Sequence, residues 1–396
     1  MEQWMEMRAA DFIEFNPRMS IKKGTIATKV AMDKLQPFTK RIPETEKAVF
    51  SGGSKFRNGD TIMARITPCL ENGKTAFVDI LREDEVAFGS TEFIVMRAKE
   101  GISDPQFIYY LATSPSFRNI AIKSMVGSSG RQRVQQSVLN DLIMKVPSLE
   151  DQKKISSVFC VLDQKIALNN EINDNLQQQA AAIFRSWFVD CAPFGGKAPD
   201  EWKNVTLEDI TALISRGITP KYADDTDQIV INQKCIRNHT IDLSLARTHT
   251  PKVVNEKWLR FGDLLINSTG DGTLGRAAQV WFRPQKLTVD SHVTIARPAK
   301  ENLIFYIGLW GILHEKEIEA LHTGSTGQTE LPRDRVKAME LLLPDNDTLD
   351  RFTALITPMA AAIVANQEEN NRLAALRDAV LPKLMSGEID VSAVQF

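Results

Sequence analysis

A glycine-rich hexapeptide is the segment whose residue types and spacing could bind a nucleotide cofactor. Gly270-Asp271-Gly272-Thr273-Leu274-Gly275 fits G-x-G-x-x-G and follows a strand-like run. In dinucleotide-binding proteins such a loop opens a helix whose N-terminus holds the pyrophosphate. Here Arg276 to Phe282, followed by Pro284, form a short strand pattern, and the corresponding stretch Thr67 to Lys74 has a single glycine. We therefore expect a turn between two strands, with a nucleotide-binding enzyme as the alternative.

Other residues that could do chemistry are not arranged to do it. The string Pro199-Asp200-Glu201-Trp202-Lys203 has the residue types of a nuclease site, but consecutive side chains cannot surround a metal ion. The sequence contains no G-x-x-x-x-G-K-[ST] loop and no Asn-Pro-Pro or Asp-Pro-Pro followed by an aromatic residue, the signature of amino-methylation. The histidines and cysteines show neither i, i+4 nor C-x-x-C spacing, so we expect no metal site and no catalytic site.

The long elements of the chain form an internal repeat. Shifting the sequence by 197 positions places the stretch from Pro147 to Phe188 over the stretch from Pro344 to Met385 without a gap. Apolar positions then coincide at spacings that alternate between four and three residues, which is the pattern of a helix packed on another helix. The first such helix, from Ile155 to Trp187, would be about 48 Å long.

The segments outside these helices are expected to be two copies of one mixed domain. Residues 1 to 146 contain strand-like runs at 61–66, 75–80 and 93–97, then a helix from about Asp104 to Lys123 and a polar loop at 127–132. Residues 197 to 343 repeat this order with little identity. The predicted fold class is α/β (α+β), with two globular domains separated by two long antiparallel helices. The predicted boundaries are 1–146, 147–196, 197–343 and 344–396.

Charge and hydropathy point to a water-soluble protein. Residues 1 to 146 carry 21 Lys+Arg against 17 Asp+Glu, whereas the helical segments carry an excess of acid. A protein that binds DNA through its globular parts and other proteins through its helices would have this distribution, and so would a solvated helix face. No run of eighteen apolar residues and no signal peptide is present, so we expect a cytoplasmic location.

Three groups of motifs resemble a known family. The helix opening at Pro147 to Gln152, the run from Ile183 to Asp190 with Pro193-Phe194, and the ending from Leu384 to Ile389 resemble the specificity subunit of type I restriction-modification systems. The stretches from Asn58 to Lys74 and from Gly89 to Phe93 resemble one type of target-recognition domain in that family. The similarity covers the whole chain, in the order variable domain, helix, variable domain, helix.

The resemblance implies a non-catalytic subunit that recognises a two-part, asymmetric duplex DNA site, one part per globular domain. It implies helices that act as spacers and dock two methylase subunits, which bind S-adenosylmethionine and methylate adenine. Two motor-nuclease subunits, with ATP and magnesium, would join for restriction, and this chain itself would bind no cofactor. A helical scaffold whose globular domains bind protein is a further alternative.

Direct recognition of bases requires Arg, Lys, Asn, Gln, Ser and Thr side chains on loops that reach the major groove. Lysines outside these loops are better suited to phosphates; they are Lys22, Lys23, Lys221 and Lys234. In the first domain the expected base-contacting residues are Arg65, Thr67, Asn72, Lys74, Ser128, Ser129, Arg131, Gln132 and Arg133. In the second domain they are Asn267, Ser268, Thr269, Thr273, Arg276, Ser325, Thr326, Gln328 and Arg333.

Polar residues on the helical seam suggest a register. Asn169 and Asn173 flank the midpoint of the first seam, and the second helix repeats them as Asn366 and Asn370. Two antiparallel helices would pair Asn169 with Asn370 and Asn173 with Asn366, fixing register at some cost in stability; exposed, unpaired asparagines are the alternative. We also expect a kink or restart at Pro358, with Thr357 as a possible cap, and an imperfection at the charged seam residue Arg377.

Overall fold

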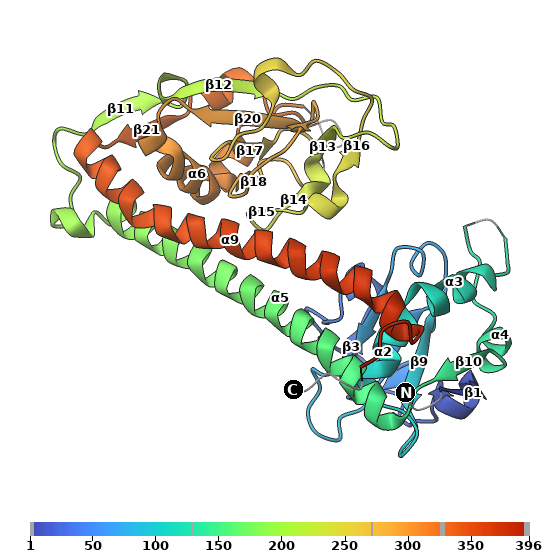
Figure 1. The fold of residues 1–396 in the computed structure, drawn as a ribbon. Coiled ribbons are helices and arrows are strands. Elements are labelled where there is room, and N and C mark those ends of the chain that lie inside the picture. The colour runs from blue at the N-terminus through green and yellow to red at the C-terminus, as the bar shows by residue number, and fades with distance from the viewer. Residues whose placement is uncertain (1–3, 129, 271, 325–328, 392–396) are drawn as a thin grey trace. The chain divides into compact units, whose positions relative to one another are not determined.

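The computed structural model describes residues 4–128, 130–270, 272–324 and 329–391 and contains two compact units (Figure 1). Unit 1 comprises Met1–Ala167 and Asn370–Phe396, and unit 2 comprises Leu168–Glu369. Each unit therefore contains one of the predicted globular segments together with part of each long helix. The predicted four-segment boundaries remain a prediction, because division by compactness cuts through the helices.

Unit 1 contains two four-stranded sheets and a pair of terminal strands. The first sheet is antiparallel throughout; its order is β2 (Ile13–Phe15), β9 (Phe93–Ala98), β6 (Thr61–Ala64) and β7 (Thr75–Phe77). The second has the order β4 (Glu46–Val49), β3 (Ile26–Val30), β8 (Ala87–Gly89) and β5 (Lys55–Phe56), with β3 parallel to β8. Strand β1 (Met5–Arg8) pairs with β10 (Ile143–Val146), and the short helices are α1 (Ala9–Phe12), α2 (Pro105–Thr113), α3 (Pro115–Lys123) and α4 (Gln136–Asn140).

The central strands of unit 1 are apolar on both faces because both faces are covered. Met63 of β6 and Ile94 of β9 pack in the cluster that contains helix α2. Their neighbours Ile62 and Val95 point the other way and pack with Val30 of the second sheet. The two-residue period of a strand thus places successive side chains into two separate cores.

The helix expected from Asp104 to Lys123 is in fact two helices, α2 and α3. Pro115 has no backbone N–H to donate and stands at the first position of α3. Ser114 therefore ends one helix and caps the next, its hydroxyl accepting from the Phe117 N–H at 3.4 Å. Prediction of one continuous helix was wrong because the apolar period runs across this break.

Unit 2 repeats the topology of unit 1. Its antiparallel sheet has the order β12 (Thr211–Arg216), β20 (Val293–Pro298), β17 (Leu264–Asn267) and β18 (Ala277–Gln279), matching β2-β9-β6-β7. A second sheet has the order β16 (Arg247–Thr248), β13 (Ile229–Ile231) and β19 (Leu287–Val289), again with a parallel pair, β13 and β19. Strand β11 (Lys203–Thr206) pairs with β21 (Glu340–Leu343), β14 (Ile236–Arg237) with β15 (Thr240–Ile241), and the helices are α6 (Ile304–Leu313), α7 (Glu315–Ala320) and α8 (Arg333–Lys337). The predicted duplication of one mixed α/β domain is confirmed.

A buried ion pair occupies the same place in both copies. In unit 1, Arg97 of β9 donates from Nε and Nη2 to the two oxygens of Asp60, both at 2.7 Å. In unit 2, Arg297 of β20 makes the same fork to Asp263 at 2.8 and 2.7 Å. Each carboxylate precedes the central strand of its sheet and is almost fully buried, so each pair fixes that strand to its neighbour.

The long helices are α5 (Leu149–Phe184) and α9 (Asn346–Met385), about 54 Å and 60 Å in length. Helix α5 continues into a π-turn over Arg185–Val189, where the Asp190 N–H donates to the Arg185 carbonyl. Helix α9 is continuous through Pro358, so the expected restart does not occur, and the kink expected as the other possibility remains a prediction. The Thr357 hydroxyl is not a cap either, since it donates to the Thr353 carbonyl inside the helix at 2.7 Å.

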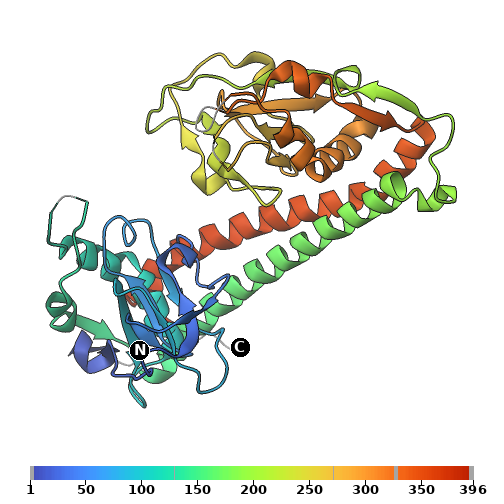
Figure 2. The same cartoon turned by 180° about the vertical axis from the view of Figure 1, so that it is seen from behind.

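One of the two predicted asparagine pairs is confirmed within unit 2, where α5 and α9 run side by side (Figures 1 and 2). The Asn366 amide donates to the Asn173 side-chain oxygen at 2.8 Å, and Phe184 lies against Phe352. Since 173 pairs with 366 and 184 with 352, the helices are antiparallel. Asn169 donates to Glu369 at 2.8 Å; the other predicted pair, Asn169 with Asn370, joins residues of different units and remains a prediction.

The charged seam residue Arg377 has polar partners, and the imperfection expected there remains a prediction. In unit 1, Arg377 Nη1 donates to Asp163 Oδ1 at 2.9 Å, and the Tyr110 hydroxyl donates to the other carboxylate oxygen at 2.7 Å. Lys40 in turn donates to the Tyr110 hydroxyl at 3.0 Å. A charged residue on the seam is accommodated here because α5 supplies an acid and α2 a phenol.

Helix α9 is long enough to cross a membrane and has a window of mean hydropathy 1.3. Its uncharged stretch, from Phe352 to Gln367, is sixteen residues, shorter than the roughly 20 that a bilayer core needs. Phe352, Ile356 and Ile363 are also fully buried in the core of unit 2. These three apolar residues of the stretch therefore face the core of unit 2, whereas Leu355 is 40% exposed.

Candidate nucleic-acid interface

In unit 1 the two loops expected to contact bases meet at one end of the first sheet. The segment after β6 begins at Arg65, whose carbonyl accepts from the Val134 N–H at 2.8 Å. The Thr67 N–H donates to the Gln132 carbonyl at 3.0 Å, and the Gln132 N–H donates back to the Thr67 hydroxyl at 3.0 Å. Segments about 65 residues apart in sequence thus form one surface, as the prediction of a shared interface requires.

The second of these loops, residues 127 to 132, is closed at its neck by backbone hydrogen bonds between Val126 and Arg133. Each N–H donates to the other residue's carbonyl, at 3.0 and 2.9 Å. Gly127 has φ 137°, and a Cβ there would lie 2.8 Å from the Arg131 carbonyl oxygen, so glycine suits this position. The neck fixes where the loop leaves the domain.

Glu92 organises the charge on this surface. Arg133 holds its carboxylate through Nε at 3.0 Å and Nη2 at 2.6 Å, and Arg65 Nε lies 3.9 Å away. The pKa of the Glu92 carboxyl is lowered, mainly by the hydrogen bonds from Arg133. Burial raises this pKa, and the positive charges of Arg133 and Arg65 lower it. One acid between two arginines leaves the surface positive, which favours a phosphate or an acceptor-rich base edge.

The expected residues of the first domain fall into two groups. Thr67 is buried, and Lys74 turns inward to the Met32 carbonyl at 2.9 Å, so both shape the loop rather than present a side chain. Asn72, Ser128, Arg131 and Arg133 are exposed, and Arg65 and Gln132 are half-buried. Ser129 lies outside the described residues.

Sequence analysis missed two residues of this surface. Glu92 binds both arginines, but an acid is not expected among residues that bind DNA phosphates. Arg118 of α3 donates to the Leu70 and Glu71 carbonyls at 3.3 and 2.5 Å and so holds the loop after β6. No local pattern marks Arg118, because its partners lie 47 and 48 residues away in the sequence.

Unit 2 builds the same surface with different side chains. The Ser268 N–H donates to the His292 carbonyl and the Leu331 N–H to the Ser268 carbonyl, both at 2.8 Å, as Arg65 bonds Glu92 and Val134 in unit 1. Thr323 and Glu330 exchange backbone hydrogen bonds at 2.8 and 2.9 Å, closing a second loop neck. The two copies therefore share these backbone hydrogen bonds at this end of the sheet.

Charged partners at this end of unit 2 differ from those of unit 1. Arg216, at the end of β12, donates from Nη1 to Glu330 at 2.5 Å and from Nη2 to the Leu331 carbonyl at 2.8 Å. The exposed His292 lies beside Thr269, with Nδ1 2.7 Å from the hydroxyl. On the same backbone, unit 2 thus carries a glutamate where unit 1 carries an arginine, and a histidine where unit 1 carries a glutamate.

Several expected residues of the second domain have roles inside the fold. Asn267 and Ser268 are fully buried, and their side chains bond Gln233 and Thr294. We therefore correct their assignment from base contacts to supports of the loop. Half-buried Thr269 and Thr273 stay on the surface loop, as does Arg276, whose Nη2 donates to the Gly272 carbonyl; Arg333 is exposed, and Ser325, Thr326 and Gln328 lie outside the described residues.

The glycine-rich hexapeptide is a turn between antiparallel strands β17 and β18, as predicted. The Thr273 and Leu274 N–H groups donate to the Gly270 carbonyl. A Cβ at Gly275 would lie 2.8 Å from the Glu319 Cα, so this glycine allows α7 to pack on the turn. Strand β18 follows two residues after Gly275, and without a helix at that point the loop lacks a pyrophosphate site.

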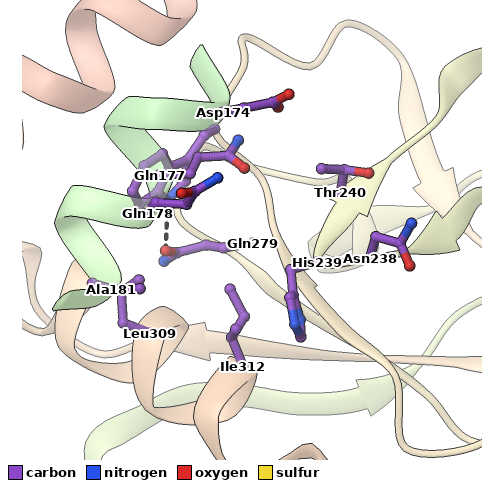
Figure 3. Close-up of a pocket in the computed structure, with 11 residues that line it drawn as sticks. Asp174, Gln177, Gln178, Ala181, Asn238, His239, Thr240, Gln279, Leu309 and Ile312 are labelled. Carbon is purple, nitrogen blue, oxygen red and sulfur yellow. Dashed lines mark hydrogen bonds between the residues drawn. The ribbon is translucent and has the colours of Figure 1, made fainter. Parts of the chain in front are cut away.

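A cavity of about 490 Å³ lies in unit 2 between α5, the β14–β15 turn and α6 (Figure 3). Its wall carries the amides Gln177, Gln178 and Asn238, and Gln279 accepts from the Trp281 indole N–H at 2.6 Å. His239 lies 3.2 Å from Glu315, whose hydrogen bond raises the pKa of the imidazole despite partial burial. Among the described residues no group of His, Cys, Asp and Glu could hold a metal ion.

Lys22, Lys23, Lys221 and Lys234, expected to touch phosphates, are all exposed. Their place on the surface is compatible with that expectation, which remains a prediction.

Comparison with known proteins tests the resemblance to type I specificity subunits. Residues 1–178 match the model of the type I restriction modification DNA specificity domain. The chain is 24% identical to the type I restriction enzyme HindI specificity subunit of Haemophilus influenzae, over 84% of this chain and 87% of that protein. It is 25% identical to the MjaIX specificity subunit of Methanocaldococcus jannaschii, over 74% of this chain and 71% of that protein. This chain is similar to type I specificity subunits, and its first 178 residues match their specificity domain.

The fold is similar to that of a solved specificity subunit. A crystal structure of the type I restriction-modification specificity subunit from M. genitalium is similar with a TM-score of 0.54, covering 96% of each chain at 13% identity. At that identity the likeness concerns the fold alone. This similarity assigns no role to the individual loop residues described above.

Proposed function

We propose that this chain is the non-catalytic DNA-recognition subunit of a type I restriction-modification complex and binds a bipartite, asymmetric duplex site. The observation that carries the proposal is the pair of equivalent loop surfaces, one per unit, with the same backbone hydrogen bonds and different side chains. Two copies of one scaffold suit two binding events of the same geometry. Different side chains suit two different base sequences.

Each surface has the features of a direct-readout element. Unit 1 has exposed arginine, asparagine and serine side chains on these loops, and unit 2 has half-buried threonines with Arg276 and the exposed Arg333. The loop necks of both units are held by backbone hydrogen bonds. A rigid neck lowers the entropy lost when a side chain binds a base. The exposed lysines would add sequence-independent affinity through phosphates.

The partners follow from the family. We propose that helices α5 and α9 space the two domains and dock two methylase subunits, which would bind S-adenosylmethionine and methylate adenine. Two motor-nuclease subunits would bring ATP and magnesium for restriction. This chain would bind no cofactor of its own, and the complex would work on chromosomal and incoming DNA in the cytoplasm.

Methylome sequencing of a host that carries this chain with its methylase tests the proposal. We expect a motif in two parts separated by unspecified bases, with one modified adenine on each strand. A palindromic or undivided motif would contradict recognition by two unlike domains. Gel-shift assays with the methylase complex provide the second test, because equal affinity for random and cognate duplex would remove sequence recognition altogether.

A further inference from the structure

We infer that the residue closing each loop neck, Arg133 in unit 1 and Glu330 in unit 2, is a specificity-determining base contact, and that the two contacts have opposite hydrogen-bond polarity. Arg133 would require a guanine, whose O6 and N7 both accept in the major groove. Glu330 would require an amino group, the N4 of cytosine or the N6 of adenine. The inference rests on the proposed function and assigns base chemistry to each half of the site.

The two residues hold the same structural position. Arg133 forms antiparallel bridges with Val126 and Ile66, and Glu330 forms antiparallel bridges with Thr323 and Thr269. The residue after each one donates its N–H to the first residue beyond the central strand, Arg65 or Ser268. Six residues separate the two members of each neck bridge in the sequence, 127 to 132 and 324 to 329, so the two necks lie at matching points.

Their chemistry is inverted. At the matching position unit 1 has a cation held by an acid, Glu92, and unit 2 has an acid held by a cation, Arg216. The supporting residues come from different strands of the sheet, the start of β9 in one copy and the end of β12 in the other. A swap of sign at a conserved backbone position changes what the loop can bind while leaving the scaffold intact.

In both pairs the neck residue is the partner that faces solvent. The side chain of Arg133 is 46% exposed against 23% for Glu92, and that of Glu330 is 56% exposed against 27% for Arg216. The inner partner therefore supports and the outer partner is presented. In a pair that only stabilised the neck, either side chain could be the outer one. The neck residue is the outer one in both units, as expected of a residue that contacts bases.

Each support orients its partner and leaves part of it for a ligand. Glu92 engages Nε and Nη2 of Arg133, so that Nη1 projects from the opposite side of the planar guanidinium. Arg216 contacts Oε1 of Glu330, leaving Oε2 for a further donor. Arg65, 3.9 Å from Glu92, adds a second positive charge beside the supporting acid.

The test uses the complex of the full chain with its methylase subunits and a duplex library randomised across both half-sites, with methylated products sequenced. Arg133→Gln should relax preference at one guanine in one half-site by about 5- to 150-fold, equivalent to about 1–3 kcal/mol for a bidentate contact. Glu330→Gln should relax one cytosine or adenine in the other half-site only. The identity of that base separates the two sources of the amino group.

Matched controls keep the test independent of folding. Arg8→Gln and Glu208→Gln remove similarly exposed members of ion pairs away from the loops and should leave both half-sites unchanged. Arg133→Lys keeps the charge but loses the planar fork, so it should keep affinity for non-cognate duplex while weakening the guanine preference.

Three results would overturn the inference: uniform loss of affinity at all positions, an unchanged motif in both variants, or relaxation at a base of the wrong polarity. If the wild-type complex shows no sequence preference, the proposed function fails first. If it shows a bipartite motif that is unchanged in the Arg133 and Glu330 variants, only the assignment of hydrogen-bond polarity to these two residues fails.

Discussion

The Asn366 side-chain amide donates to the side-chain oxygen of Asn173 at 2.8 Å, across the interface of α9 and α5 in unit 2. Asn173 is 6% exposed, so water does not replace this partner readily. The pair acts like a polar residue in the seam of a coiled coil. It selects one register, because every other register leaves an amide buried and unpaired.

Replacing one of these asparagines should therefore cost more than replacing both. We expect Asn173→Leu to lower the free energy of unfolding by about 1–3 kcal/mol, because Asn366 then loses its partner. The double variant with Asn366→Leu should recover most of that loss. Urea unfolding of the two single variants and the double variant gives the coupling energy. Asn175→Leu, at an exposed position of the same helix, serves as control, and additive losses would contradict the pairing.

The buried fork between Arg297 and Asp263 leads to a second prediction. Asp263→Asn should remove the carboxylate and leave the arginine, which is 8% exposed, without its counter-charge, at a cost of about 3–5 kcal/mol. Glu208→Gln, which breaks an exposed pair with Lys337, should cost less than about 1 kcal/mol. Calorimetry of the two variants compares the losses, and equal values would show that burial adds nothing to the Arg297 pair.

Stability should also depend on pH through His239 in the wall of the unit 2 cavity. The hydrogen bond that His239 donates to the Glu315 carboxylate raises the pKa of this imidazole above its usual value near 6.5. A raised pKa in the folded state stabilises the protein below pH about 6.5, and the contribution disappears as pH rises through the folded pKa.

His239→Asn isolates this contribution, because asparagine also tolerates the left-handed backbone at this position, φ 61°. The difference in melting temperature between wild type and variant should be largest near pH 5 and shrink towards pH 8. The mutation His322→Asn, at an exposed histidine, provides the control. A difference that grows with pH would show that the imidazole is stabilised in its neutral form.

Sequence periodicity predicted the long helices and one pair between them, but not the places where helices break or continue. The 197-residue shift, the seam and the pairing of Asn173 with Asn366 all follow from spacing, because side chains on one helix face recur every three to four residues. The split at Ser114 and the continuity of α9 through Pro358 were missed. Proline is compatible with a first helical turn, as in α3, and with the interior of α9, where Phe352 and Ile363 on either side are buried in the core.

Sequence analysis located the loops of the candidate interface, but it did not identify which of their side chains face solvent. Asn267 and Thr67 have the same side-chain types as base-contacting residues, yet tertiary hydrogen bonds to Gln233 and Gln132 place them inside. Those bonds span 34 and 65 residues, and no local pattern encodes them. Glu92 and Arg216 were missed for the same reason, since each acts through a charge supplied by a distant loop.

A buried polar chain in unit 1 gives the last prediction. Tyr110 is 1% exposed, and its hydroxyl donates to Asp163, which also binds Arg377 of α9. Burial, followed by the negative charge of Asp163, raises the pKa of the phenol well above its usual range, so the phenol remains a donor at physiological pH.

Tyr110→Phe removes this donor but keeps the ring that packs on Phe159, so we expect a loss of about 1–3 kcal/mol from a hydrogen bond to a charged group. Asp163→Asn should cost more, because it leaves Arg377, 19% exposed on its side chain, without a full counter-charge. Urea unfolding, with Tyr222→Phe at an exposed tyrosine as control, gives the two values. The opposite order would mean that Asp163 is held mainly by the phenol, and that the ion pair between α5 and α9 contributes little to the docking of α9 in unit 1.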